Sequence, residues 1–458
     1  MAEKPKESYR IPSSVRAAMR QLRERGYEAY LVGGAVRDFL LGGLPADFDL
    51  ATDATPEQVL EVFSAYTCIP TGIAHGTVTV LMNGRPLEIT TYRVDGAYTD
   101  ARRPETVAFS RSLAEDVARR DFTINALAMS EDGEIVDYVG GRVDLAQHVI
   151  RAVGDPDRRM REDALRILRA LRFSAVLGFP IEENTRMSLF RHRRLLKKIS
   201  VERVYAELCG LLCGEFADRI LLYYTEILGV IMPEILPMKG FLQHNPHHIH
   251  DVLTHTAVVL KNTPPQRSLR FAALFHDIGK PGAFTMDESG IGHFYGHQKI
   301  SCEIATEILG RLKADAKTTK EVEILVLWHD IDIEPTARVI RRRLHQFGEP
   351  MFRSLLAIKR ADTLGQSEQS LYRLEEQTRI HDILDKIMEE KECFTLRDLK
   401  LNGSDVIRLG VTKGPDVGRV LSSVLHAVMD GKIENEETVL QEYASRMIRT
   451  GDNINDLT

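Results

Sequence analysis

Cysteine is scarce in this chain. The 458 residues include five cysteines, and none of them forms a Cys-x-x-Cys motif. Cys209 and Cys213 would lie one helical turn apart, but no histidine stands at zinc-finger spacing from them. These absences argue against a disulfide-stabilised secreted domain and against a cysteine zinc site, so we expect reduced thiols.

Long apolar segments are missing as well. The N-terminal sequence MAEKPKESYRIPSSV has no apolar core of the kind that signal peptides carry. The most apolar stretch, residues 220–236, is interrupted by Glu226, Gly229 and Pro233 and therefore does not read as a membrane span. We expect a cytoplasmic protein without membrane association.

The chain has no overall excess of positive charge. Its formal net charge is −6, and 43% hydrophobic with 28% charged residues is typical of a globular protein of two to four domains. Basic residues nevertheless concentrate locally, with six arginines in residues 158–172 and six lysines or arginines in residues 186–198. Each run is either a solvated helix face or a contact for RNA phosphates.

Hydrophobic periodicity predicts a mixed sheet with flanking helices, followed by an almost wholly helical chain from Asp157 onward. The expected elements are a helix over residues 13–26 capped by Ser13 or Ser14, a strand over 29–32, a helix from Gly33-Gly34 through Leu41, a strand over 48–51, a helix over 57–64 capped by Thr55, and a hairpin of 77–82 and 86–91 around Asn83-Gly84. Breaks in the pattern place domain boundaries near residues 154–156, 240 and 392.

Two aspartates beside a glycine-rich turn carry the clearest chemistry. Asp47 and Asp49 are two residues apart, so on a strand both carboxylates would point to one face, where they could hold a pair of Mg²⁺ ions. Gly33 and Gly34 would let backbone N–H groups approach a triphosphate at the start of a helix. The alternative is a solvated turn.

Four segments occur in order along the first half of the chain: LVGGAVRDFLLGGLPADFDLAT, RRDFTINA, DYVGG and REDALR, which begin at residues 31, 119, 137 and 161. Together they resemble the motifs of the class II tRNA nucleotidyltransferase and bacterial poly(A) polymerase family over roughly residues 25–215. The resemblance implies an α+β fold with a polymerase-β-like nucleotidyltransferase head (1–153). It implies an all-helical remainder made of a neck that binds RNA and selects the base (154–240), a metal-binding body (241–392) and a tail that binds tRNA (393–458).

The resemblance also assigns residues to the incoming nucleotide. The implied nucleotide-binding residues are Gly33, Gly34, Arg37, Asp38, Arg120, Asp121, Asn125, Glu162, Asp163, Arg166 and Arg169. Of these, Arg120, Asp121 and Asn125 have a spacing that would share one helical face. The alternative for the second motif is that Arg119 and Arg120 only pair with Glu115 and Asp116. Glu88 on the second hairpin strand is a candidate third catalytic carboxylate, beside Asp47 and Asp49.

Base selection is expected in the fourth motif, where Glu162, Asp163 and Arg166 would fall within one helical turn. A carboxylate accepts hydrogen bonds and a guanidinium donates them. Cytosine and adenine offer an amino donor beside a ring acceptor, whereas uracil and guanine offer the opposite arrangement, so an Asp-plus-Arg edge would favour CTP and ATP. The alternative is a surface salt bridge, which contributes under about 1 kcal/mol.

Asp100 and Arg103 match an Asp-x-x-Arg element in the flexible loop of full CCA-adding members. That element argues against an enzyme that adds only CC. It leaves open an enzyme that adds only the terminal A, and a poly(A) polymerase also remains an alternative.

A second group of residues resembles the core of the HD phosphohydrolase superfamily. The implied metal ligands are His255, His276, Asp277 and Asp362, with His297 and His329 as further candidates. Imidazole with carboxylate suits a transition metal, which could activate water for phosphoester hydrolysis. The alternative is a set of buried structural histidines. No role is assigned to the histidines of residues 244–250.

The sequence therefore predicts a nucleotidyltransferase that uses CTP, ATP and two Mg²⁺ ions to build or repair the 3′-terminal CCA of tRNA. An alternative of a different class is a metal phosphohydrolase or phosphodiesterase centred on the HD residues.

Overall fold

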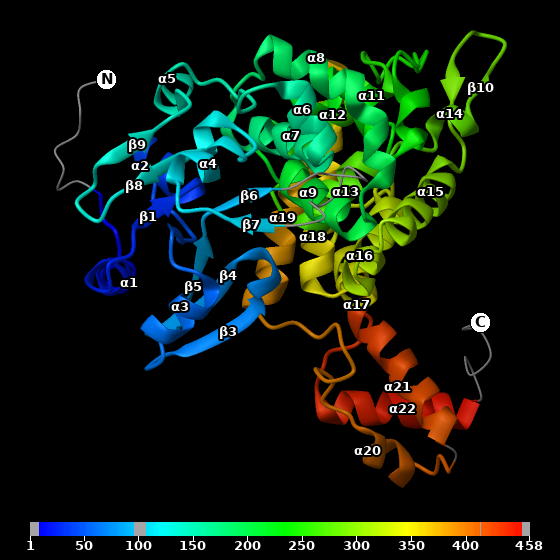
Figure 1. The fold of residues 1–458 in the computed structure, drawn as a ribbon. Coiled ribbons are helices and arrows are strands. Elements are labelled where there is room, and N and C mark those ends of the chain that lie inside the picture. The colour runs from blue at the N-terminus through cyan, green and yellow to red at the C-terminus, as the bar shows by residue number, and fades with distance from the viewer. Residues whose placement is uncertain (1–8, 96–106, 413, 451–458) are drawn as a thin grey trace. The chain divides into compact units, whose positions relative to one another are not determined.

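The computed structural model describes residues 9–95, 107–412 and 414–450 (Figure 1). The chain divides into two compact units. The first consists of Met1–Leu236 with Ile308–Ala314, and the second consists of Pro237–Glu307 with Asp315–Thr458. The finer division into head, neck, body and tail stays a prediction.

A seven-stranded mixed sheet forms the centre of the N-terminal part, in the order β3-β4-β5-β2-β1-β8-β9. Only β2 and β5 pair in parallel, and the other neighbours are antiparallel. The bounds are β1 Ala29–Val32, β2 Asp49–Thr52, β3 Thr67–Gly72, β4 Thr77–Met82, β5 Arg85–Thr91, β8 Leu127–Met129 and β9 Ile135–Asp137, with a separate ribbon of β6 Arg93–Asp95 and β7 Val107–Phe109. The predicted α+β class is confirmed.

Local sequence explains how this sheet is connected. Asn83 and Gly84 adopt positive φ angles of 52° and 76°, which the tight turn between β4 and β5 requires, so the predicted hairpin is confirmed. Thr55 caps α3 in a capping box with Gln58, also as predicted. The predicted serine cap of α1 is wrong, because extended Pro12 occupies the N-cap position and Ser13 is already helical.

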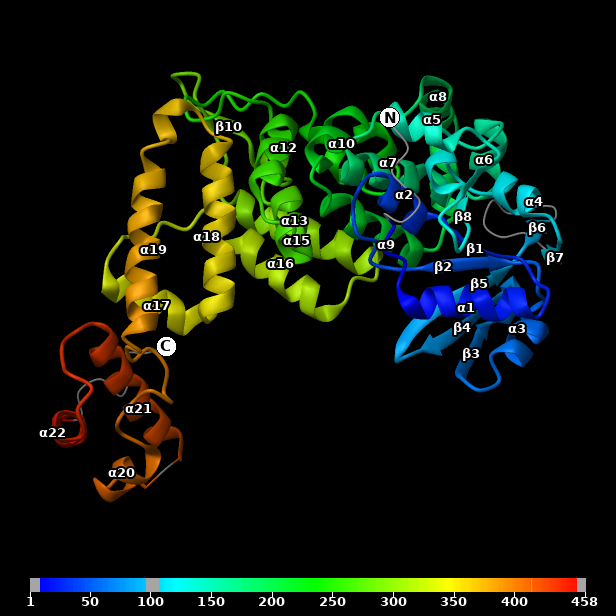
Figure 2. The ribbon, with the colours of Figure 1, turned by 90° about the vertical axis from the view of Figure 1, so that its left-hand side faces the viewer.

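Helices flank the sheet and continue beyond it in the first unit. Helices α1 and α3 pack together and against β4 (Figure 2). The bounds are α1 Ser13–Glu24, α2 Gly34–Leu40, α3 Pro56–Val62, α4 Leu113–Ala118, α5 Gly141–Ala146, α6 Pro156–Glu162, α7 Leu165–Leu177, α8 Glu183–His192, α9 Val201–Leu212, α10 Ala217–Tyr223 and α11 Thr225–Leu228. Helix α7 packs against both α9 and α10, and this contact brings the fourth motif to the neighbourhood of α9.

The later part of the chain is helical except for a two-stranded hairpin of β10 Thr285–Met286 and β11 Gly292–His293, which the periodicity did not predict. Helices α18 and α19 run side by side, with α17 packed against both (Figure 2). The bounds are α12 Val252–Asn262, α13 Arg267–Phe275, α14 Lys280–Ala283, α15 His297–Arg311, α16 Ala316–Trp328, α17 Ala337–Phe347, α18 Glu349–Leu364, α19 Arg373–Glu389, α20 Gly403–Arg408, α21 Gly414–Met429 and α22 Glu437–Thr450.

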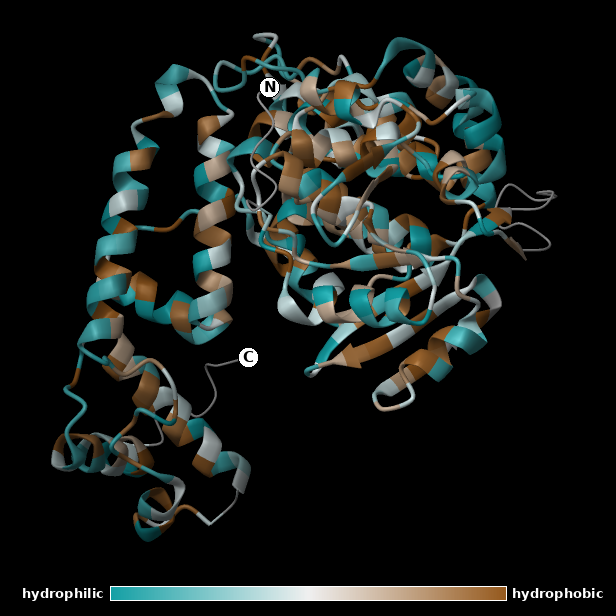
Figure 3. Ribbon diagram, turned by 60° about the vertical axis from the view of Figure 1, so that its left-hand side comes forward, coloured by the Kyte–Doolittle hydropathy of each residue, from teal (hydrophilic) through white to brown (hydrophobic). Residues whose placement is uncertain are grey.

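The hydropathy pattern agrees with these packing arrangements. Hydrophobic and hydrophilic residues alternate along the turns of the long helices, as expected when one face is buried (Figure 3). All five cysteines are free thiols. Among the described residues, no helix combines the length and the apolar character that crossing a membrane requires.

Candidate active site and metal centre

The carboxylates of the first motif lie beside a third one. Asp49 is the first residue of β2, and the parallel register places it directly opposite Glu88 of β5. Asp47 lies two residues before the strand and is exposed, as Asp49 is. Two of the three predicted catalytic carboxylates, Asp49 and Glu88, therefore lie side by side on neighbouring parallel strands, and the third, Asp47, lies in the loop that leads into β2.

The electrostatics of Asp49 reflect this crowding. Asp49 is open to solvent on one side, but the protein around it partly desolvates its carboxylate. This desolvation and the negative charge of Glu88 raise the pKa of Asp49 to about 6, with a smaller contribution from Asp47 and an opposing one from Arg120. Clustered carboxylates repel one another, and a bound cation would relieve that repulsion. Carboxylate oxygens are the donors that Mg²⁺ prefers, so the residues present fit the expected ion.

The glycine turn brings the first two motifs together. Gly33 has a φ of 74°, and a side chain there would also come within 3.4 Å of the Arg120 guanidinium. Arg37 on α2 donates to the Asn125 side chain at 2.7 Å and to Asp38 at 2.9 Å. Glycine is therefore required at position 33, and the predicted nucleotide-binding groups of both motifs share a hydrogen-bond network.

The second motif is not a helical face, contrary to the prediction. Helix α4 ends at Ala118, and Asn125 lies in the short 3₁₀ turn Thr123–Asn125. Arg119 and Arg120 both pair with the buried carboxylate of Asp116, at 2.5 and 3.1 Å. The residues of the second motif are therefore positioned by this short turn and not by a continuous helix. The ion pair that the sequence offered as an alternative is present.

Asp121 is tied to helix α7. Arg169 of α7 donates to it from Nε at 2.7 Å and contacts it through a terminal nitrogen at 2.6 Å. Burial opposes ionisation of Asp121, but Arg169 holds the pKa of this carboxyl below its ordinary value. This two-point contact fixes α7 against the second motif.

The fourth motif is also not a single helical turn, and this prediction was wrong. Helix α6 ends at Glu162, and Asp163 is extended, with φ −141° and ψ 103°. The Asp163 carboxylate instead accepts the backbone N–H of Leu165 at 3.1 Å and a hydrogen bond from Arg203 at 2.7 Å. The bond to Leu165 satisfies one backbone N–H at the start of α7 and favours this break.

Arg166 is buried and anchored from several sides. It donates to the Glu162 carboxylate at 2.8 Å and to the backbone carbonyls of Arg159 and Arg119 at 3.0 and 2.9 Å. These bonds use three of the five N–H donors of its guanidinium, and the bonds that Asp163 accepts from Leu165 and Arg203 leave further acceptor positions on its carboxylate. Both groups therefore keep hydrogen-bonding capacity for a ligand.

Most arginines of residues 158–172 are engaged internally, so this run is a weaker candidate for RNA contacts than the sequence suggested. Arg158, Arg159 and Arg166 surround Glu162, while Arg169 and Arg172 contact Glu207. The second run retains exposed cations at Arg194, Lys197 and Lys198. Asp100 and Arg103 lie outside the described residues.

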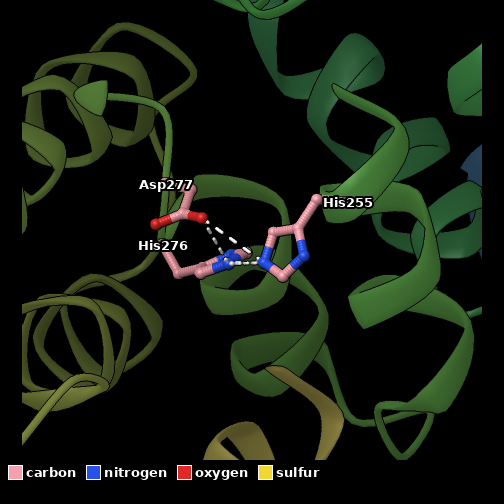
Figure 4. Close-up of side chains that lie close together, drawn as sticks. All are labelled: His255, His276 and Asp277. Atoms are coloured by element: carbon pink, nitrogen blue, oxygen red, sulfur yellow. Dashed lines mark hydrogen bonds and ion pairs between the residues drawn. The ribbon is translucent and has the colours of Figure 1, made fainter. Parts of the chain in front are cut away.

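The HD-type residues of the second unit converge. His255 from α12, followed by His276 and Asp277 at the end of α13, meet as shown in Figure 4. Asp277 places Oδ2 at 3.4 Å from His255 and 3.2 Å from His276, and Oδ1 at 3.3 Å from His297 and 3.8 Å from His329. Asp362 of α18 lies 2.9 Å from His255. Asp277 therefore stands between two pairs of imidazoles.

All four imidazoles are oriented in the same way. Each donates Nδ1–H to a backbone carbonyl, at 3.1 Å for His255, 2.8 Å for His276, 2.9 Å for His297 and 2.7 Å for His329. The Nε2 atoms consequently face one another in the cluster, with 3.3 Å separating each of the pairs His255–His276 and His297–His329. This is the arrangement in which histidine binds a metal, with one nitrogen fixed and the other directed inward.

Two groups in this cluster have the geometry for a metal ion: His255 with His276 and Asp277, and Asp277 with His297 and His329. Burial opposes the charge of Asp277, but His276 and Lys280 hold the pKa of its carboxyl well below the ordinary value. Lys280 Nζ lies 2.7 Å from Asp277. The mixed imidazole and carboxylate set fits a transition metal better than Mg²⁺.

Three family models match parts of this chain. Residues 29–151 match a model described as the poly A polymerase head domain, residues 178–239 a probable RNA and SrmB-binding site of polymerase A, and residues 284–444 a putative tRNA nucleotidyltransferase domain 2. A CCA-adding enzyme of Leuconostoc citreum is 36% identical over 94% of this chain and 95% of its own length. The chain belongs to the CCA-adding enzyme family.

Other members of the CCA-adding enzyme family support this conclusion. One from Streptococcus agalactiae is 33% identical over 96% of this chain and 98% of its own length. The crystal structure of the Bacillus stearothermophilus CCA-adding enzyme in complex with CTP matches with a TM-score of 0.72 and 30% identity, covering 98% of this chain and 99% of that one. The predicted family, enzyme class and head-and-helices fold are confirmed, so the chain is a nucleotidyltransferase.

Several structural contacts of this CCA-adding family member were not identified from the sequence. Glu207 contacts Arg169 and Arg172 of α7, and Arg203 holds Asp163. Lys280 adjoins His276-Asp277 in the sequence, so its distance of three residues from Asp277 could have suggested the ion pair. The other contacts join residues far apart in the chain, and no local pattern marks them.

Proposed function

We propose that this chain adds or repairs the 3′-terminal CCA of tRNA, taking CTP and then ATP without a nucleic-acid template. The relatives named as CCA-adding enzymes, and the similar structure that holds CTP, support the reaction and its nucleotide. The observation that carries the proposal for this chain is the register pair of Asp49 and Glu88, with Asp47 beside it.

In this proposal Asp47 and Asp49 hold two Mg²⁺ ions, and Glu88 contributes the third carboxylate. Bound Mg²⁺ would neutralise the charge that develops between the attacking 3′-hydroxyl and the leaving pyrophosphate. Arg37, Asp38, Arg120, Asp121 and Asn125 position the sugar and triphosphate. Gly33 and Gly34 allow the close approach of the phosphates to the start of α2.

Asp163 and Arg166 act as the protein template that reads the base, with Glu162 and Arg169 as supporting groups. The network around them favours this role, because Arg203 and Glu162 fix the two side chains while donors and acceptors remain available. Fixed groups discriminate better, since a wrong base leaves a desolvated partner unpaired.

Nucleotide incorporation by Asp49→Ala and Asp49→Asn tests the transferase assignment. Both changes are expected to abolish addition of CTP and of ATP, because neither side chain provides the carboxylate charge that the metals require. Retention of tRNA binding in the same variants shows that the fold is intact. Incorporation within a few-fold of the wild-type rate would contradict the proposal.

A second function is favoured by the convergence of the four Nε2 atoms around Asp277 in the second unit. We propose that His255, His276, Asp277 and Asp362, with His297 and His329, hold transition-metal ions and that this centre is a phosphoester hydrolase site. The metal, when bound, would supply an activated water. Metal analysis of the purified protein tests it: His297→Ala should lower the bound metal, and His250→Ala, on a neighbouring segment, should not.

A further inference from the structure

The Phe173 ring of α7 is a point where three arginine side chains of the first unit meet. The guanidinium carbons of Arg37, Arg169 and Arg172 lie 5.4, 5.3 and 4.4 Å from the centre of this ring. Distances below about 6 Å allow a cation to interact with the face of an aromatic ring. Arg169 and Arg172 belong to α7 itself, whereas Arg37 comes from α2, which follows the glycine turn. The ring therefore connects the first motif with the helix that begins beside the fourth motif.

The positive charges around the ring are balanced by carboxylates. Each guanidinium has its own carboxylate partner, in the pairs Arg37–Asp38 at 2.8 Å, Arg169–Asp121 at 2.6 Å and Arg172–Glu207 at 2.6 Å. Phe173 is therefore not the group that offsets the repulsion between the arginines. Its ring is only 6% exposed and supplies a rigid, flat surface to all three guanidiniums at once.

The same ring packs against the second motif. Phe122 meets it edge to face, with ring centres 5.8 Å apart and 81° between the planes. Phe122 is fully buried and directly follows Asp121 in the chain. Edge-to-face pairs have a preferred geometry, so this contact fixes the orientation of the Phe173 ring. One side chain of α7 thus contacts the first motif through Arg37 and the second motif through Phe122.

We infer that Phe173 is a positioning residue that holds Arg37 and α7 in one geometry, so that triphosphate binding and base reading are coupled. The inference rests on the transferase function proposed above, in which Arg37 positions the triphosphate and Arg166 reads the base. Arg166 lies two turns before Phe173 on α7, a rise of about 10 Å along the same rigid helix. A cation–π contact typically contributes a factor of about 2 to 30 to an equilibrium constant.

Incorporation of CTP and of UTP into one tRNA by the full-length Phe173→Leu variant tests this inference. Leucine removes the ring faces and keeps a buried apolar side chain. KM for CTP should rise about 2- to 30-fold, and the preference for CTP over UTP in kcat/KM should fall by a similar factor. In an Arg37→Gln background, Phe173→Leu should change KM for CTP less than about twofold, because the cation that the ring holds is already absent.

Phe179→Leu is the matched control, because Phe179 belongs to the same unit and is 7% exposed. Its ring stacks on His148, with centroids 4.8 Å apart. This variant should lower the melting temperature and leave KM and base preference unchanged. Both variants are assayed below their melting temperatures, and Phe173→Met takes the place of Phe173→Leu if the leucine variant does not fold.

Unchanged KM or unchanged base preference in Phe173→Leu would overturn the inference. Equal effects on KM with and without the Arg37 guanidinium would also overturn it, as would the same changes in Phe179→Leu. A wild-type protein that does not add CTP to tRNA would instead contradict the proposed function itself, so the two failures are distinguishable.

Discussion

Arg203, in the first turn of α9, donates a hydrogen bond of 2.7 Å to Asp163 at the junction of α6 and α7. The two side chains are 30% and 20% exposed, so water only partly screens the pair. The other oxygen of Asp163 accepts the N–H of Leu165. A residue proposed to read the base is thus oriented by a helix that lies about forty residues further along the chain.

Arg203→Ala should damage base choice more than transfer. Losing a hydrogen bond to a charged group typically costs about 1.5–3 kcal/mol, so the preference for CTP over UTP should fall about tenfold or more. The measurement is kcat/KM for both nucleotides on one tRNA. Arg203→Lys keeps the charge but lacks the planar guanidinium, so its preference for CTP over UTP should lie between those of the wild type and Arg203→Ala. An equal loss with both nucleotides would argue against an orienting role.

Mg²⁺ use in the head should depend on pH through Asp49. The pKa of Asp49 is raised to about 6, so protons compete with the metal below that value and not above it. The Mg²⁺ concentration that gives half-maximal CTP incorporation should therefore be constant above about pH 7 and rise as the pH falls through 6. A flat dependence from pH 5 to pH 7.5 would contradict this account.

Glu88→Gln should shift that dependence to lower pH. Glu88 is the largest charged contributor to the raised pKa of Asp49, after desolvation, so removing its charge should lower the pKa. The substitution should also slow incorporation if Glu88 takes part in catalysis. An unchanged midpoint would mean that desolvation alone sets the pKa.

The sequence predicted the elements of the head well because their signals are local. Thr55 with Gln58, and Asn83-Gly84, are self-contained cap and turn patterns, and both are present. The second and fourth motifs were wrongly expected on continuous helices, because spacing alone does not reveal that Asp163 follows the end of α6 and accepts the Leu165 N–H at the start of α7. The contacts of Arg203 with Asp163 and of Glu207 with Arg169 and Arg172 depend on tertiary packing, which periodicity does not report.

Exposed cations of the second basic run should contact tRNA phosphates. Lys197→Glu, alone and combined with Arg194→Glu, should weaken tRNA binding and reduce its salt dependence, because fewer counterions are released. Each lost phosphate contact lowers the slope of log K against log salt by about 0.7–0.9. Lys317→Glu, an exposed cation outside the run, is the matched control. Equal weakening of tRNA binding by Lys197→Glu and Lys317→Glu would indicate a non-specific charge effect.

Metal removal should destabilise the second unit. Without bound metal, Asp277 and Asp362 contact only protein groups such as His255 and His297. A metal ion that binds the folded protein and not the unfolded chain stabilises the fold, so bound metal should raise the melting temperature. Chelation should lower Tm, and Mn²⁺ should restore it. Asp277→Asn should abolish the restoration, because Asp277 faces both histidine pairs. A Tm that does not respond to chelator in the wild type would contradict metal binding.

The most direct test of the central claim is incorporation of labelled CTP and ATP into one tRNA supplied without a tail, with C and with CC. The account predicts ordered addition of two C and one A, followed by arrest, on the substrate without a tail. If only the CC-ended tRNA is extended, and only with ATP, the result would contradict complete CCA addition and indicate an enzyme that adds only A. Addition of many successive adenosines would contradict it in favour of a poly(A) polymerase.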